Sequence, residues 1–214
     1  MNESLQYSER LPRRTDAPPF LLILLHGYGA NEHDLLGLAD ALDPRFHCVS
    51  PRAPLDLPWG GHAWYGIDFL EDGVECRFEQ APAALAPLET LLDSLRARLA
   101  PAQTFLLGFS QGGGMALNLG LRRPGDIDGV VSLSGLYAPP LHPDPQPTVP
   151  PTYPVFMSHG RQDPVLPVES GRQARQLVES LSVDLTYREY DMAHEINPHC
   201  LEDLRAWLDA RLPA

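Results

Sequence analysis

The sequence predicts an α/β protein in which a mostly parallel, doubly wound sheet carries helices on both faces. Two observations predict this class: short apolar runs alternate with amphipathic stretches, and most of the runs are continuously apolar. Continuous apolar runs are typical of strands buried on both faces of a parallel sheet, and strands that alternate with helices favour the doubly wound arrangement. The length of 214 residues fits one domain over 1–214, with 1–19 as an N-terminal extension or an edge strand.

The expected elements follow one another along the chain. Strands are expected at 20–25, 46–50, 104–109, 129–133, 155–158 and 185–190. Helix-like segments, whose apolar residues recur at helical spacing, lie at 34–42, 83–99, 168–181 and 201–208. A further helix is expected behind the run at 104–109, where "SQGGGMALNL" begins.

Two stretches break this alternation. Residues 51–79 are rich in proline, glycine and aromatic side chains, and so long an irregular segment in a compact domain is usually functional or mobile. Residues 138–154 are dense in proline. This composition also fits a PxxP ligand, but we favour a stiff surface connection between two strands.

The composition excludes several classes of function. The formal net charge is −12, so the chain is not expected to bind nucleic acid by bulk electrostatics. Cys48, Cys76 and Cys200 are widely spaced and form no CxxC, which favours reduced thiols in the cytoplasm. The polar N-terminus does not resemble a signal peptide, and the apolar run at 20–25 is shorter than the about 20 residues that span a bilayer. We therefore expect a cytoplasmic protein without stable membrane insertion.

The stretch "GFSQG" at 108–112 matches G-x-S-x-G, the nucleophile elbow. A serine on such a sharp strand-to-helix turn leaves no room for side chains two residues away, which explains Gly108 and Gly112. The backbone N–H of Gln111 lies at the start of the following helix, where it can donate to an oxyanion. The alternatives are a glycine-rich turn with a chance serine and a phosphate-binding loop, but the chain has no GxxxxGK[ST] motif and no lysine.

A nucleophilic Ser110 needs a histidine held by a carboxylate, and on such a sheet the chain order is serine, acid, histidine. His194 follows the run at 185–190 and is the expected base, in preference to His142, His159 and His199. His159 is instead expected to pack beside the acid loop. Asp163 follows the run at 155–158 and is the expected acid, with Asp191 as its main competitor.

The loop after the first apolar run, "LLHGYGANEHD", is the expected source of a second oxyanion donor, the backbone N–H of Tyr28. An ordinary glycine turn is the alternative. No metal site is predicted: "HEINPH" at 194–199 is H-E-x-x-x-H rather than H-E-x-x-H, and Pro198 would disrupt a helix that must align both ligands.

These motifs resemble one family when they are taken in order. "LLHGYGAN", "PRAP", "AWYGID", "LLGFSQGGGMAL", "LSG", "SHGRQDPVLP" and "MAHEI" are similar to motifs of the small carboxylesterase, lysophospholipase and acyl-protein thioesterase family of α/β-hydrolases, from about residue 20 to the C-terminus. The resemblance implies an α/β-hydrolase fold without a large cap domain, a Ser110–His194–Asp163 triad, an oxyanion hole at Tyr28 and Gln111, no cofactor, and a homodimer in several members.

The resemblance also implies an acyl pocket near "AWYGID". The candidate wall residues, which are equally good candidates for the core, are Trp59, Trp64, Tyr65, Phe69, Leu70 and Leu166. The segment around them is shorter and more glycine-rich than expected of long-chain thioesterases. We therefore expect a serine hydrolase of carboxylic esters with short to medium acyl chains, or of thioesters. The alternatives are a lysophospholipase or acyl-protein thioesterase, a peptidase or lactonase on the same scaffold, and a non-catalytic binding module.

Overall fold

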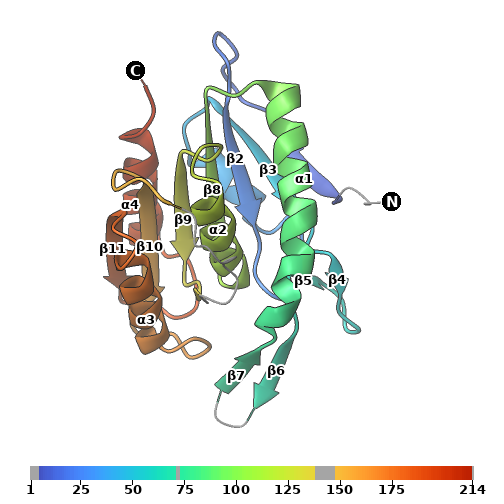
Figure 1. Cartoon of the computed structure of the whole chain (residues 1–214), viewed down its shortest axis with the longest axis vertical. Coiled ribbons are helices and arrows are strands. Elements are labelled where there is room, and N and C mark those ends of the chain that lie inside the picture. Colours follow the sequence, from blue (N-terminus) through green and yellow to red (C-terminus); the bar gives the residue numbers. More distant parts are fainter. Residues whose placement is uncertain (1–4, 71–72, 138–147, 214) are drawn as a thin grey trace.

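A seven-stranded sheet lies at the centre of the protein (Figure 1). In this computed structural model the described residues are 5–70, 73–137 and 148–213. The strand order is β1-β3-β2-β8-β9-β10-β11, and all neighbours are parallel except β1 with β3. The strands are β1 (Tyr7–Arg10), β2 (Phe20–Leu25), β3 (Phe46–Pro51), β8 (Gln103–Phe109), β9 (Gly129–Leu133), β10 (Pro154–Gly160) and β11 (Asp184–Tyr190).

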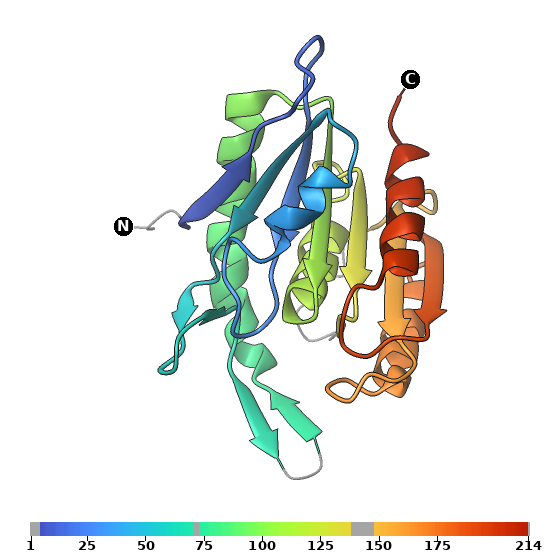
Figure 2. The same ribbon diagram turned by 180° about the vertical axis from the view of Figure 1, so that it is seen from behind.

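Helices cover both faces of the sheet, as the sequence predicts for this class. On one face lie α1 (Ala81–Leu99), α2 (Gln111–Arg122) and α3 (Val168–Glu179). Figure 2 shows the opposite face, which carries η1 (Leu35–Asp40) and α4 (Pro198–Asp209). Among the described residues, no helix is long and apolar enough to cross a bilayer.

The segment at 34–42 differs from the expectation of an ordinary amphipathic helix, because η1 is a short 3-10 helix. Asp34 at its start forms no side-chain cap. Gly37 lies in its middle, and glycine disfavours an α-helix by about 1 kcal/mol relative to alanine. The remaining predicted helices are α-helices.

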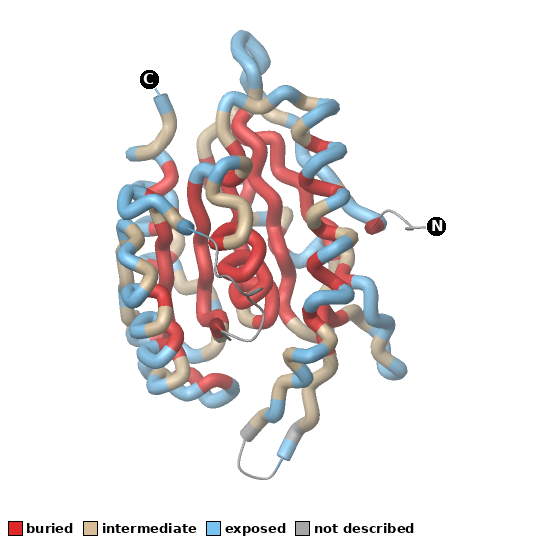
Figure 3. The backbone as a smooth tube through the Cα atoms, in the orientation of Figure 1, coloured by how far each residue is buried: buried red, intermediate tan, exposed pale blue. Residues whose placement is uncertain are grey.

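The central strands are buried on both sides, which explains their continuous apolar runs. In β2, Leu21 and Ile23 pack into the core under α1 and α2, whereas Leu22 and Leu24 pack into the core under η1 and α4. This alternation follows from the opposite directions of successive strand side chains. Figure 3 shows the burial concentrated in the middle of the sheet.

The irregular stretch at 51–79 forms two short hairpins beyond the carboxyl ends of the parallel strands (Figure 1). The first pairs β4 (Leu55–Asp56) with β5 (His62–Ala63). The second pairs β6 (Ile67–Leu70) with β7 (Gly73–Cys76). The chain then enters α1 through the short helix η2 (Phe78–Gln80). Of the proline-rich stretch at 138–154, residues 138–147 lie outside the described residues.

Candidate active site

Ser110, His194 and Asp163 converge at the carboxyl ends of three parallel strands. Ser110 follows β8, Asp163 follows β10, and His194 follows β11. His194 Nε2 lies 2.9 Å from Ser110 Oγ, and His194 Nδ1 lies 2.6 Å from Asp163 Oδ2. Since the two bonds use both ring nitrogens, the imidazole can accept the serine proton on Nε2 while Nδ1–H donates to the carboxylate.

The turn at Ser110 explains Gly108, whereas Gly112 is explained by the neighbouring end of β2 and not, as the sequence predicted, by the turn itself. Ser110 has φ 55° and ψ −120°, a conformation that costs a non-glycine residue on the order of 1–3 kcal/mol. A Cβ on Gly108 would lie 2.0 Å from the carbonyl oxygen of Gly112, and a Cβ on Gly112 would lie 1.9 Å from that of Leu25. Glycine is therefore required at both positions, and the Ser110 N–H is held by the Leu133 carbonyl at 2.8 Å.

The carboxylate of Asp163 is buried, and one of its two oxygens is engaged by its own loop. Its Oδ1 accepts the backbone N–H groups of Val165 at 2.9 Å and Leu166 at 2.8 Å, which leaves Oδ2 for His194. Asp191, the competing candidate from the sequence, has an exposed side chain and pairs with Arg161 at 2.8 Å. The geometry therefore brings Asp163, and not Asp191, to the histidine.

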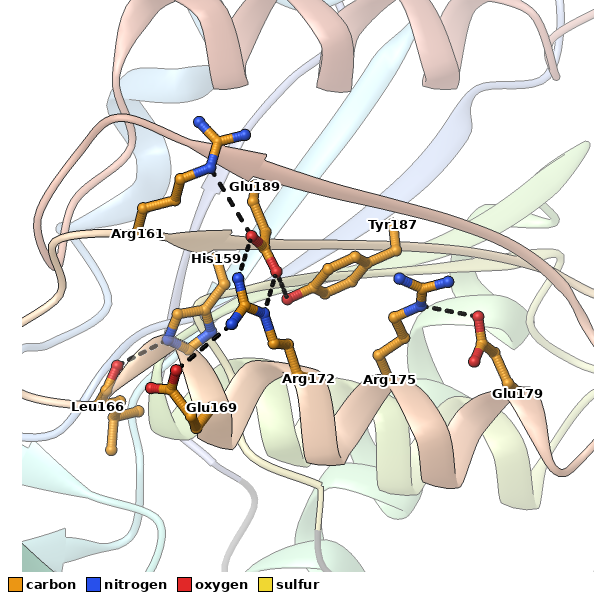
Figure 4. A network of polar contacts seen from close by, with 9 residues as sticks. All are labelled: His159, Arg161, Leu166, Glu169, Arg172, Arg175, Glu179, Tyr187 and Glu189. Carbon is orange, nitrogen blue, oxygen red and sulfur yellow. Dashed lines mark hydrogen bonds and ion pairs between the residues drawn. The ribbon is translucent and has the colours of Figure 1, made fainter.

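His159 supports the acid loop from behind. Its Nε2 donates to the Leu166 carbonyl at 2.8 Å and lies 3.5 Å from Asp163 Oδ2, which agrees with its expected position beside this loop. Figure 4 shows the ring pointing to Leu166, next to an ion-pair network in which Glu189 binds Arg172 through two bonds and faces Arg161. His199 is exposed at the start of α4, and His142 lies outside the described residues.

The two candidate oxyanion donors lie beside Ser110. Gln111 is the first residue of α2, where a backbone N–H has no acceptor within the helix. Tyr28 lies in the loop after β2, and a Cβ built on the preceding Gly27 would lie 3.4 Å from the Cβ of Ser110. Both Tyr28 and Gln111 line the same pocket as Ser110 and His194.

His26 stabilises the loop that carries Tyr28. Its Nδ1 donates to the Gly27 carbonyl at 2.7 Å, and its Nε2 accepts the Ala53 N–H at 3.1 Å. An acceptor on Nε2 requires the neutral ring. Burial lowers the pKa of His26 below its usual value, in agreement with this tautomer.

A pocket of about 250 Å³ opens at Ser110. Tyr65 and Leu166, which the sequence singled out, line it. Five further lining residues were not predicted from the sequence: Ile67, Val74, Cys76, Leu136 and Val165. Apolar residues alternate with acidic ones in these two strands, at Ile67 and Phe69 and again at Val74 and Cys76. This period of two residues is typical of a half-buried strand and could have predicted the hairpin wall from the sequence.

Three of the candidate wall residues lie elsewhere. Trp64 is only 1% exposed and packs in the core, where its indole N–H donates to the His26 carbonyl at 2.9 Å. A buried indole needs such an acceptor, and this one turns Trp64 away from the pocket. Trp59 and Leu70 are exposed to solvent on the two hairpins. The side chain of Phe69 lies outside the described part of the structure.

The pocket wall holds no cluster that could bind a metal ion. Among the described residues there is no group of three or more histidine, cysteine or acidic side chains with such geometry. Pro198, which argued against the zinc motif, is the first residue of α4, and Asn197 caps that helix by accepting the Cys200 N–H. Burial raises the pKa of the Cys76 thiol to about 11, so the thiol in the pocket is neutral.

Comparisons with known proteins agree with this architecture. The model of the phospholipase/carboxylesterase family matches residues 12–212. An acyl-protein thioesterase 1 from Gibberella zeae is 34% identical over 122 residues, and this match spans 54% of the chain and 51% of that relative. An acyl-protein thioesterase 1 from Neurospora crassa is 29% identical over 218 residues, which cover 90% of the chain and 86% of the relative.

A solved structure extends the similarity over the whole fold. The crystal structure of esterase PE8 superposes with a TM-score of 0.87 at 29% identity, covering 98% of this chain and 100% of that chain. The family model, the relatives and the fold therefore agree. The chain belongs to the phospholipase/carboxylesterase family of α/β-hydrolases and is a hydrolase of the ester-cleaving class.

Proposed function

We propose that the protein hydrolyses carboxylic esters or thioesters with short to medium acyl chains through an acyl-enzyme on Ser110. The observation that carries the proposal is the continuous line of hydrogen bonds from Ser110 Oγ through His194 to Asp163, with distances of 2.9 and 2.6 Å. Both distances lie in the range in which a proton passes between heavy atoms.

The geometry supports the following sequence of steps. Ser110 Oγ attacks the substrate carbonyl while His194 Nε2 takes its proton, and Asp163 stabilises the imidazolium that forms. The oxyanion receives the backbone N–H groups of Tyr28 and Gln111. His194 then protonates the leaving alcohol or thiol, and a water molecule repeats the attack on the acyl-enzyme with His194 again as the base.

The pocket supports the choice of a modest acyl chain. At about 250 Å³ it is smaller than the roughly 300–1,000 Å³ typical of sites for drug-sized ligands. Its walls beyond the candidate triad are mainly apolar, with Ile67, Val74 and Leu136 among them, which suits an alkyl chain. The alternative is a lysophospholipase or acyl-protein thioesterase reaction, which the names of several relatives favour.

A variant of the candidate nucleophile tests the proposal. We expect Ser110→Ala to lower kcat for p-nitrophenyl butyrate by a factor on the order of 10⁶, as in comparable triads, with an unchanged melting temperature. A fluorophosphonate probe should label the wild type and not the variant, which also tests the non-catalytic alternative. Near wild-type turnover by purified Ser110→Ala would refute the assignment.

A substrate panel separates the remaining possibilities. Oxygen esters and thioesters from acetyl to palmitoyl, together with a lysophospholipid, a lactone and a peptide, should be compared by kcat/KM. The proposal predicts a maximum at short to medium acyl chains. A maximum at palmitoyl thioesters or at the lysophospholipid would instead favour the alternative. The homodimer and the cytoplasmic location stay predictions from the sequence.

A further inference from the structure

The side chain of Gln111 makes contacts that the proposed chemistry does not use. Its Oε1 accepts the backbone N–H of Trp64 at 2.7 Å, and its Nε2 donates to the backbone carbonyl of Tyr65 at 2.7 Å. The residue is 4% exposed, so neither bond competes with bulk water. Because Trp64 offers a donor and Tyr65 an acceptor, only the observed orientation of the amide satisfies both.

The same short segment also holds the loop that carries the other candidate donor. The Trp64 indole donates to the His26 carbonyl at 2.9 Å. Two residues earlier, His62 pairs through its backbone with the loop: its carbonyl accepts the Gly29 N–H at 2.9 Å, and its N–H donates to the Ala30 carbonyl at 2.8 Å. Residues 62–65 therefore contact both sides of the site.

We propose that the side-chain amide of Gln111 is a positioning group, which joins the two oxyanion donors into one hydrogen-bonded unit through residues 62–65. This inference rests on the proposed function, because it presumes that the N–H groups of Tyr28 and Gln111 receive the oxyanion. One end of the unit is the backbone of Gln111 itself, and the other is the Tyr28 loop. The Tyr28 loop follows β2 and Gln111 follows β8, two strands that pair as far as Leu25 and Gly108. Beyond the ends of these strands, the bridge through 62–65 connects the two donors a second time.

Such a bridge acts on the transition state more than on the bound substrate. Oxyanion donors are effective at about 2.7–3.1 Å from the developing charge, and removal of one donor costs about 10²–10³-fold in kcat where it has been measured. A loosened bridge misplaces a donor without removing it, so a smaller loss is expected. KM should change little, because the ground-state carbonyl depends less on these donors.

Two variants at Gln111 test the bridge, since both keep the backbone N–H. In Gln111→Glu, one carboxylate oxygen can accept the Trp64 N–H while the other faces the Tyr65 carbonyl and repels it. In Gln111→Met, both bonds are lost without a new charge. With p-nitrophenyl butyrate we expect kcat to fall at least 10-fold in both variants and KM to change less than about 3-fold.

A boronic acid that forms a tetrahedral adduct on Ser110 provides a second readout. Its inhibition constant should rise in both variants by the factor by which kcat/KM falls, because the adduct resembles the transition state. If Gln111 had a purely structural role, its variants would have a lower melting temperature, but their inhibition constants would not rise in proportion to the loss in kcat/KM. The variant Trp64→Phe removes the bond to His26 together with part of a buried ring system, and it should lose about 3-fold in kcat. It preserves the test should both Gln111 variants fail to fold.

Gln80→Glu is the matched control. Gln80 is another glutamine that holds this segment, and its Oε1 accepts the Gly66 N–H at 2.9 Å. It does not line the pocket. Because a carboxylate retains this acceptor, we expect Gln80→Glu to keep kcat within about 2-fold of the wild type.

The outcomes separate this inference from the proposed function. If folded Gln111→Met keeps kcat within 2-fold, or raises KM alone, the positioning role is wrong while the ester hydrolysis stands. If only Gln111→Glu is impaired, the introduced charge and not the bridge is responsible, and the inference is again overturned. If the wild type neither reacts with the fluorophosphonate nor cleaves any ester, the proposed function fails and the inference falls with it.

Discussion

The two sides of the candidate cleft are built in different ways. On one side, Ser110, Asp163 and His194 stand at the ends of strands inside a seven-stranded sheet. On the other, part of the pocket wall is a hairpin with four residues in each strand, β6 and β7, which pair only with each other in the described part of the chain. A two-stranded hairpin is at best marginally stable by itself, so the wall depends on contacts with the rest of the molecule.

Ile67 and Cys76 of the hairpin pack against the main core. Polar bonds hold the segment that leads into β6, where Gln111 binds Trp64 and Tyr65 and Gln80 binds Gly66. Two further bonds, between Arg77 and Asp68, join the two ends of the hairpin to each other. Ser110 and Asp163 are held within the sheet edge and the acid loop: the Ser110 N–H donates to the Leu133 carbonyl, and Asp163 Oδ1 accepts two backbone N–H groups. The difference teaches that the candidate triad stands on the paired strands of the sheet, whereas the hairpin beside it can change at low structural cost.

The largest effect is expected on the sheet side. Asp163→Asn keeps the size of the acid but removes the acceptor that holds His194 in the reactive tautomer, so kcat should fall by about 10⁴-fold. Steady-state kinetics with p-nitrophenyl butyrate measures this. Asp191→Asn is the matched control, because its carboxylate is exposed and pairs with Arg161, and it should retain activity. Equal losses in both variants would contradict the assignment.

An ion pair near the Tyr28 loop should give the largest effect on stability. Glu32 is 1% exposed, and the hydrogen bonds from Arg52 lower its pKa to about 2, well below the usual 4.5. A carboxylate with a lowered pKa stabilises the folded state at higher pH, so this contribution should disappear as the pH falls from about 4.5 to about 2. From the shift it is at most about 3 kcal/mol.

Urea unfolding measures this contribution. At pH 7, Glu32→Gln should be less stable than the wild type by up to about 3 kcal/mol, and the difference should shrink towards pH 2. Glu202→Gln, the same change at an exposed position of α4, is the control and should stay within about 0.5 kcal/mol. A pH-independent difference for Glu32→Gln would show that the ion pair is not its origin.

A substitution in the wall should change the choice of substrate more than the rate. Val74→Trp fills part of the pocket, so kcat/KM for a hexanoyl ester should fall about 10-fold relative to an acetyl ester. The ratio of the two kcat/KM values is the measurement. Glu75→Trp places the same side chain on the opposite, exposed side of β7 and should leave the ratio unchanged. A similar shift in both variants would mean that the hairpin as a whole was disturbed.

The smallest effect is expected at the tip of the same hairpin. Leu70 is 58% exposed and does not line the pocket, so Leu70→Ser should change the free energy of unfolding by less than about 0.5 kcal/mol. Activity on short acyl esters should also be unchanged. If kcat/KM instead fell more for long than for short acyl esters, Leu70 would contact the acyl chain, as the sequence predicted.

The local sequence was sufficient to predict the central strands and the turn at Ser110. The apolar runs predicted the central strands because a strand buried on both faces must be apolar throughout, and each predicted strand differs from the observed one by at most two residues at either end. Gly108 of "GFSQG" predicted the turn at Ser110 because the clash that it avoids, with the carbonyl oxygen of Gly112, occurs within five consecutive residues. The clash that Gly112 avoids is with the carbonyl oxygen of Leu25 and depends on the packing of α2 against the end of β2. The antiparallel edge strand β1 is polar and mostly exposed, so it gave no comparable signal.

Only the tertiary structure decided which aromatic residues line the pocket. Trp64 and Tyr65 are adjacent aromatic residues that the sequence does not distinguish. In the structure the Trp64 indole donates to the His26 carbonyl in the core, whereas Tyr65 lines the pocket. The two hydrogen-bond partners of the Gln111 side chain, Tyr65 and Trp64, lie 46 and 47 residues away in the sequence, so no local pattern predicts them. A sequence reveals what a residue requires from its chain neighbours, but the partners that satisfy a buried polar group are chosen when distant segments pack together.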